Sequence, residues 1–200
     1  LPEEKRGRFK EVKAELAQLS LQFSQNNIKE TNDFVLHLTQ REDLAGLPDS
    51  QIEQAAAAAA ERQLEGWVFT LHAPSFGPFM QYAENRALRE RMYRAYMTRC
   101  AHDNARNNFE ICKKLVNLRM EMAQLLGFPG YADYVLKKRM AQTPERVYNL
   151  LEELKTHYLA PARREVEAVE QLAKAKEGTD FELMPWDFAH YAHLLKLRDY

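Results

Sequence analysis

Three side chains near the end of the sequence, Asp187, His190 and His193, have the residue types of a metal or proton-transfer site. They are spaced i, i+3, i+6 in a segment with a helical pattern, and helix neighbours three apart can share a ligand. However, successive steps of three drift around a helix, and metal-binding helices usually present an i, i+4 histidine pair. The spacing therefore favours a solvated or hydrogen-bonded helix face over a metal site.

A second group consists of arginines, which could bind a carboxylate, a phosphate or an acidic partner. Acidic residues alternate with them in the sequence, so pairing within the chain is the favoured interpretation. The six arginines are Arg86, Arg89, Arg91, Arg94, Arg99 and Arg106, and the acidic residues are Glu84, Glu90, Asp103 and Glu110. Arg119 stands apart, because its helix has two apolar sides, and it is expected to meet a buried carboxylate or carbonyl.

Other reactive groups give weaker signals. His102 and Asp103 are adjacent, and adjacent residues do not face each other on a helix. Cys100 and Cys112 form no CxxC pair, which favours buried reduced thiols over a disulfide or a metal site. The sequence contains no GxSxG, GxxxxGK[ST], GxGxxG or HExxH motif. No catalytic, cofactor-binding or metal-ligating residue is predicted in this chain.

Composition narrows the classes of function. The 200 residues carry a formal net charge of −1, so there is no overall basic field to hold nucleic acid or an anionic membrane. Hydrophobic residues make up 46% and charged residues 28%, which is ordinary for a globular protein. No apolar run reaches the roughly 18 residues of a membrane helix, and LPEEKRGRFK lacks the layout of a signal peptide. A cytoplasmic location is expected.

The first third of the chain alternates between helical and strand patterns. Phe9, Val12, Leu16, Leu19 and Phe23 predict a helix that ends near residues 26–27. Period-two alternation predicts short strands at 34–39 and 67–71. Between them a helix is expected, capped by Ser50 and Glu53 and containing the alanines 55–60. The two strands could pair in parallel through a crossover or as an antiparallel ribbon.

The middle of the chain predicts a loop at 72–78, from its Pro and Gly content, and then two helices. The first begins near Pro78 or Asn85 and runs to about Cys100. The second spans about 107–126 and ends at Gly127 before Pro129. Its apolar residues form two stripes, so it is expected to lie between neighbours on both sides. The stripes are Ile111, Leu115, Leu118, Met122 and Leu125, of which the last four are expected in the core, and Phe109, Cys112, Val116, Ala123 and Leu126.

The last third predicts three further helices. A short one covers about 131–138, and Thr143 caps a long one that Pro161 should kink or restart. The apolar residues of the long helix begin Val147, Leu151, Leu154 and Tyr158. A final helix starts near Trp186, and Trp186, Tyr191 and Leu195 are expected to form an exposed apolar patch through which the chain could dimerise. The fold class is mainly α, a multi-helix assembly with one small two-stranded β element.

Several segments, in order, resemble the thimet-oligopeptidase-like zinc peptidases of peptidase family M3. They are LPEEKRGRFKEVKAELAQLSLQFSQN, FVLHLTQREDLAGLP, WVFTLHAPSFGPFMQYAENRALRERMYRAYMTR, LRMEMAQLLGFPGYADYVLKKRMAQTPERVYNLLEEL and PWDFAHYAHLLK. GLPDS, WVFTLHAPS and the NRALRE run are most similar to the peptidyl-dipeptidase branch. The resemblance implies a larger all-α, zincin-type enzyme that hydrolyses short peptides and releases C-terminal dipeptides.

In that family a later HExxH segment supplies the zinc ligands and the general base, and no position in this chain matches it. The resemblance thus implies that residues 1–200 form a non-catalytic helical wall of the substrate channel, with a strand–helix–strand insert at about 33–72. Zinc is expected in the full-length parent and not in this part. The implied partners are short peptides and the catalytic half of the same chain. The alternative is an autonomous helical interaction module that uses the arginine-rich helices, and an HExxH beyond residue 200 would decide between the two.

Overall fold

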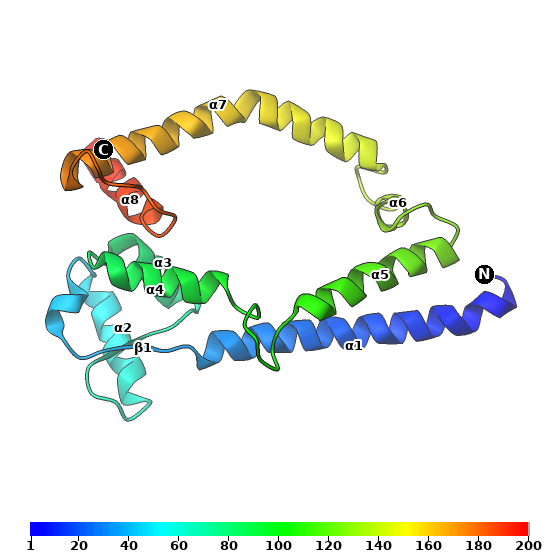
Figure 1. The fold of residues 1–200 in the computed structure, drawn as a ribbon, viewed down its shortest axis with the longest axis horizontal. Helices are drawn as coiled ribbons and strands as arrows, with labels where there is room; N and C mark the ends of the chain where they lie inside the picture. Colours follow the sequence, from blue (N-terminus) through cyan, green and yellow to red (C-terminus); the bar gives the residue numbers. More distant parts are fainter. Residues whose placement is uncertain (200) are drawn as a thin grey trace. The chain divides into compact units, whose positions relative to one another are not determined.

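The computed structural model describes residues 1–199, which are mainly α-helical with one two-stranded sheet, as the sequence predicted (Figure 1). The chain forms two compact units. The first combines Leu1–Ile28 with Cys100–Ala162, and the second combines Lys29–Arg99 with the chain from Arg163 onward. No helix within residues 1–199 is long and apolar enough to cross a membrane.

The first unit is built on an antiparallel pair of helices, α1 (Glu3–Asp33) and α5 (Phe109–Leu125), which lie side by side in Figure 1. Val12, Leu118 and Met122 form the buried centre of their contact. Arg8 forms a bidentate pair with Glu121, with Nε–Oε1 at 2.6 Å and Nη2–Oε2 at 2.8 Å. This pair fixes the register of the two helices at one end.

At the other end the predicted stop of α1 near residues 26–27 is wrong, since the helix continues to Asp33. Asn26 is buried, and its Nδ2 donates to Oδ1 of Asn108 at 2.9 Å. The Asn108 amide in turn donates to the carbonyl oxygen of Phe23 at 3.1 Å. Asparagine is common at helix ends, but here its amide is satisfied by a second helix and does not compete with the α1 backbone.

The expectation that α5 is covered on two sides is wrong for the first half of the helix. Leu115, Leu118 and Met122 are buried as predicted, and Leu125 is partly buried. On the second stripe, Phe109 and Val116 are exposed, whereas Ala123 is buried and Leu126 is partly buried. One apolar side of α5 therefore packs against α1, and the N-terminal half of the other side is exposed.

The end of α5 was predicted correctly. Gly127 has φ +82°, and Phe128 N donates to the Ala123 carbonyl while Gly127 N donates to that of Gln124. This is the Schellman arrangement. The short helix α6 (Tyr131–Leu136) follows, and then α7 (Pro144–Glu177), whose first turn is capped by Thr143 Oγ1. Pro161 lies inside α7, and the helix does not restart there.

The second unit contains the sheet, in which β1 (Leu36–Leu38) and β2 (Trp67–Phe69) pair antiparallel, with Leu36 opposite Phe69. Both strands lie inside the predicted segments but are shorter. They are separated by a 3-10 turn, η1 (Arg41–Leu44), and by α2 (Asp49–Ala60). The Ser50–Glu53 capping box does not form, because Pro48 is the N-cap and its carbonyl accepts the first helical bonds, which places Ser50 inside the helix.

The segment predicted as a loop at 72–78 forms most of the helix α3 (Ala73–Tyr82). Pro74 fits this helix because the first-turn backbone nitrogens have no helical acceptor. Pro78 removes one internal bond, and neighbouring contacts offset this, since Phe79 and Met80 are buried. The helix α4 (Arg86–Met97) begins at Asn85, one of the two starts expected, and α8 spans Phe188–Asp199.

The core of the second unit lies between the sheet, α2, α3 and α4. It includes Leu36, Phe69, Phe79 and Met92, and Trp186 packs into it from the segment before α8. Phe69 and Phe79 make an edge-to-face contact at 4.7 Å between ring centroids. This core holds the end of α3, the start of α4 and the start of α8 close together, and their polar groups form the site described next.

Candidate functional site

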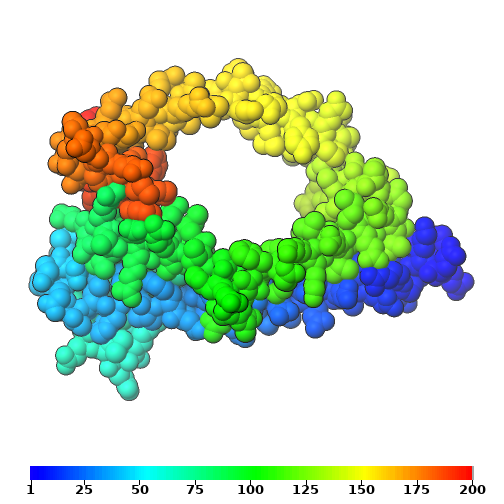
Figure 2. All heavy atoms as spheres, in the orientation of Figure 1, coloured from blue at the N-terminus to red at the C-terminus, as the bar shows by residue number. Residues whose placement is uncertain are grey.

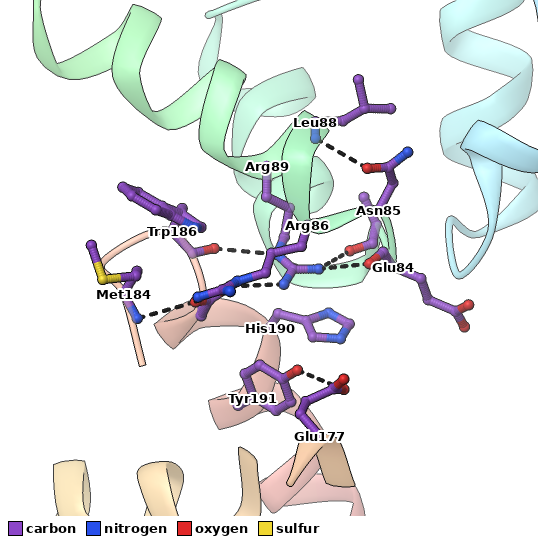
Figure 3. Close-up of polar contacts among 12 residues, drawn as sticks. Glu84, Asn85, Arg86, Leu88, Arg89, Glu177, Met184, Trp186, His190 and Tyr191 are labelled. Carbon is purple, nitrogen blue, oxygen red and sulfur yellow. Dashed lines mark hydrogen bonds and ion pairs between the residues drawn. The ribbon is translucent and has the colours of Figure 1, made fainter. Parts of the chain in front are cut away.

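A polar cluster of the second unit joins the first turn of α4 to Asp187, the residue just before α8. Figure 3 shows Arg86 and Arg89 of α4 beside Met184 and Trp186 of the segment before α8. Asn85 caps α4 by accepting a hydrogen bond from Leu88 N at 3.2 Å, which sets the helix start. Arg86 and Arg89, three apart, therefore lie on one face of the first turn. Both guanidinium groups reach the same carboxylate.

The geometry is that of two charge-assisted pairs on one acid. Arg86 Nη2 lies 2.7 Å from Asp187 Oδ2, and Arg86 Nε lies 3.1 Å from each oxygen. Arg89 Nη2 lies 2.9 Å from Oδ1. The Asp187 side chain is fully buried and Arg89 is 1% exposed, whereas the Arg86 side chain is 43% exposed. Arg89–Asp187 is thus a buried ion pair, and Arg86 connects it to solvent.

Arg89 also satisfies the carbonyl groups that α3 leaves free at its end. Its Nη1 donates to Ala83 O at 2.7 Å and to Glu84 O at 3.1 Å. Its Nε donates to Trp186 O at 3.3 Å, next to Asp187. A cation at a helix C-terminus complements the helix dipole. One side chain therefore ties α3, α4 and the segment before α8 together.

Asp187 remains ionised in this setting. Burial by itself raises the pKa of its carboxyl, but hydrogen bonds from Arg86 and Arg89 and from the backbone N of Met184, at 3.1 Å, outweigh burial and lower the pKa below its usual value. Its position at the N-terminus of α8 also favours the negative charge. Arg86, held by the same contact, has a raised pKa.

Two side chains of α8 extend the cluster. His190 is buried and its Nδ1 lies 3.1 Å from the Gln81 carbonyl oxygen. Burial, reinforced by the charge of Arg89, lowers the pKa of His190, so the ring is neutral at pH 7. Tyr191 donates to Glu177 Oε1 at 2.9 Å, and burial together with this bond raises the pKa of Tyr191.

These groups line a pocket of about 390 Å³, whose walls include Glu84, Arg86, Lys176, Glu177 and His190. The buried ions bind one another, and no nucleophile faces a neutral base among the residues lining it. The arrangement can hold α8 against α3 and α4, and it presents the exposed part of Arg86 and Lys176 to solvent. The cluster is therefore a structural contact between helices.

The candidate metal triad does not form as a ligand set. Asp187 is used by the two arginines, and His190 and His193 both contact Gln81, whose Nε2 lies 3.0 Å from His193 Nδ1. Within residues 1–199, no three His, Cys, Asp or Glu side chains lie together as a metal site would require. The sequence predicted that Asp187, His190 and His193 are either solvated or hydrogen-bonded. Hydrogen bonding is confirmed, and solvation is wrong for Asp187 and His190, which are buried.

The prediction that the arginines pair within the chain is confirmed for several of them, although Asp187, the shared partner of Arg86 and Arg89, lies about a hundred residues further along. Arg94 pairs with Glu90 at 2.7 Å, as the alternating charges suggested, and its guanidinium lies over the Trp186 ring. Arg99 bonds Thr31 and the Tyr96 carbonyl. These arginines are therefore committed to the fold, which counts against an interaction module that uses them to bind a partner.

Other expectations need correction. Arg119 is exposed, and its guanidinium lies 5.6 Å from the centroid of the Tyr131 ring, not against a buried carboxylate. Cys100 is a buried free thiol as expected, but Cys112 is exposed, because it lies on the exposed half of the second α5 stripe. His102 and Asp103 lie in the connection between α4 and α5, outside any helix.

The predicted exposed patch at the last helix is wrong as well. Trp186 and Tyr191 are buried, the first in the sheet core and the second against Val169 and Ala173 of α7, and Leu195 is partly buried beside them. These apolar residues are covered within the second unit and offer no surface for dimerisation.

Comparison with known proteins gives the family. The model of peptidase family M3 matches residues 79–200. Oligopeptidase A of Escherichia coli (strain K12) is 39% identical over 209 positions that cover 100% of this chain and 30% of the relative. A probable cytosolic oligopeptidase A of Arabidopsis thaliana is 35% identical, and the dipeptidyl carboxypeptidase of E. coli is 30% identical over 96% of the chain. The chain belongs to peptidase family M3, and it spans about 30% of the length of these curated relatives.

Proposed function

We propose that residues 1–200 act as a non-catalytic helical part of a zinc metallopeptidase that hydrolyses short peptides. The observation that carries the proposal is the match to peptidase family M3 together with 39% identity along the whole chain to a protein named for oligopeptidase activity. The chain matches only 30% of that relative, which leaves room for a catalytic segment elsewhere in the same protein.

The residues described here do not fit a zinc site, since they bring no three ligating side chains together. In the proposed enzyme the zinc ligands and the general base are supplied by residues outside this chain. The role proposed for the chain itself is scaffold and channel wall. The Arg86–Asp187–Arg89 cluster supports a scaffold role, because its groups bind one another and fix three helices.

The cleavage pattern is the finer part of the proposal. Release of C-terminal dipeptides is what the peptidyl-dipeptidase resemblance implies, and the E. coli dipeptidyl carboxypeptidase is a relative at 30% identity. The higher identity to oligopeptidase A, 39%, supports action on oligopeptides. We further propose a cytoplasmic location, supported by the plant relative that is named cytosolic, with neither nucleic acid nor a membrane as partner.

The test uses the full-length protein and the isolated chain of residues 1–200. We expect the full-length protein to retain about one zinc ion after dialysis and to cleave a blocked oligopeptide in a reaction that a chelator abolishes. Mass spectrometry of the products separates sequential dipeptide release from internal cleavage. The isolated chain should show neither tight zinc nor turnover. A full-length protein without chelator-sensitive hydrolysis would exclude the proposed enzyme, and tight zinc with turnover in residues 1–200 would exclude the non-catalytic role.

A further inference from the structure

The first half of α7 carries apolar side chains that the described structure does not cover. Val147, Leu151, Leu154 and Tyr158 follow one another at steps of four, three and four, which is the heptad spacing of a coiled-coil seam. We call these four residues the α7 seam. Val147 is partly buried, all residues from 148 to 160 are exposed, and Figure 2 shows this segment, in yellow, at the surface. A seam of this kind is the sequence pattern of a helix that packs against another helix.

The charges beside the seam indicate what kind of helix fits it. At 100° per residue, Lys155 lies about 70° and Arg146 about 110° from the centre of the seam. Glu152 and Glu153 lie further back, each at about 130°. Lys155 is paired with Glu152, with Nζ 3.3 Å from Oε2, but both side chains are exposed, so this pair is weak and a partner carboxylate can compete for the lysine. The charges nearest to an approaching helix are therefore basic, and a partner with carboxylates on both sides of its apolar stripe would complement them.

A second copy of this chain fits less well. Two α7 helices packed antiparallel about Leu154 would bring Lys155 next to its own counterpart, and a parallel pair would place no carboxylate beside either basic residue. Like charges at such positions disfavour the pairing. The seam is thus better suited to a helix of different sequence.

We propose that the α7 seam docks an amphipathic helix flanked by carboxylates, which a segment of the same protein outside residues 1–200 supplies. We assign the docking helix to the same protein because of length: the whole chain aligns with the relative, but it covers only about 30% of that relative. This inference rests on the proposed function, because both require a longer protein. It adds the surface of residues 1–200 that contacts the rest of the protein and the chemistry of that contact.

Hydrogen exchange measured by mass spectrometry tests the proposal. We compare peptides that cover residues 148–160 in the full-length protein and in the isolated chain, and expect at least tenfold slower exchange in the full-length protein. A matched pair of variants tests the face. Leu154 and Leu159 are 43% and 42% exposed and share one helix, but Leu159 lies about 110° from the seam centre. In the full-length protein Leu154→Ser should abolish most of the extra protection, and Leu159→Ser should leave it within about twofold.

Charge is tested in the same protein with Lys155→Glu, which should increase exchange across 148–160 several-fold, whereas Glu152→Gln should not. Equal exchange in the two chains, or equal effects of the two serine variants, would overturn the proposal. So would concentration-dependent dimers of residues 1–200 whose contact maps to Leu154, since the occupant would then be a second copy. Protection at the α7 seam without chelator-sensitive hydrolysis would refute the proposed function alone, and hydrolysis without protection would refute the docking alone.

Discussion

Replacing Asp187 by asparagine should destabilise the second unit more than any other single change in its polar cluster. The substitution keeps the size of the side chain and removes the charge that two guanidinium groups share. Arg86 can turn to solvent, because it is 43% exposed, but Arg89 is 1% exposed and cannot. The consequence is a buried cation without a counter-ion.

The size of the effect follows from that burial. Removing one partner of a buried ion pair typically costs about 3–5 kcal/mol, since the remaining charge has lost both water and its partner. Arg89 retains the carbonyl groups of Ala83, Glu84 and Trp186, so we expect about 3 kcal/mol, at the lower end of that range. A loss of this size is a large share of the stability of a small unit.

The assay is urea unfolding followed by tryptophan fluorescence, because Trp67 and Trp186 are the two tryptophans of the sequence and both lie in the second unit. The transition midpoint should fall while its slope stays constant. Glu121→Gln is the control. It breaks the exposed Arg8–Glu121 pair of the first unit, and should leave the fluorescence transition unchanged.

A double variant tests the cause. Adding Arg89→Met to Asp187→Asn removes the orphaned cation, so the double variant should lose at least about 1 kcal/mol less than the sum of the two single losses. A loss below about 1 kcal/mol for Asp187→Asn, or strict additivity in the double variant, would show that the cluster is not the coupled buried pair described here.

Three further predictions concern other elements. Leu118→Ala should cost about 2–4 kcal/mol in thermal unfolding followed by circular dichroism, because Leu118 is buried between α1 and α5, and a loss below about 0.5 kcal/mol would mean a surface site. Gly66→Ala should lower the free energy of unfolding far more than Gly127→Ala does. Both glycines have positive φ, but a Cβ at Gly66 would collide with the Leu38 carbonyl oxygen, whereas one at Gly127 meets nothing. Equal losses of stability in the two variants would contradict this prediction. The pKa of His190 is lowered in the folded state, so the unfolded state binds its proton first as the pH falls below about 6.5. Stability should therefore fall from that pH until the folded pKa is reached, by up to about 1.4 kcal/mol per pH unit, and His190→Gln should remove this part of the pH dependence.

Sequence reasoning succeeded where a structure depends on nearby residues. The Gly127 cap, the Thr143 cap and the two short strands each follow from a few adjacent positions, and all are present. It failed where a distant segment changes the outcome. Asn26 does not end α1 because Asn108, far along the chain, satisfies its amide. The proline-containing segment 72–78 becomes helical because core packing at Phe79 and Met80 offsets a lost backbone bond.

The polar cluster was missed for the same reason. Local pairing rules connect Arg86 and Arg89 only to acidic residues close in sequence, and they present Asp187 only as a possible metal ligand. Two signals were available. The arginines are three apart at a helix start, and Asp187 stands just ahead of another helix with Trp186 beside it. Joining them requires the contact between α4 and the start of α8, which no local pattern contains.

The apolar side chains show the same limit of local sequence patterns. Sequence periodicity identified the stripes on α5, α7 and α8 equally well, yet it misjudged which of them are covered. The α8 residues are buried inside the second unit, whereas the N-terminal half of one α5 stripe and most of the α7 seam are not. Periodicity reports that a face is apolar, and it cannot report whether the covering element belongs to the same stretch of chain. The exposed half of the second α5 stripe and the α7 seam both belong to the first unit, so that unit is where we expect the rest of the protein to pack.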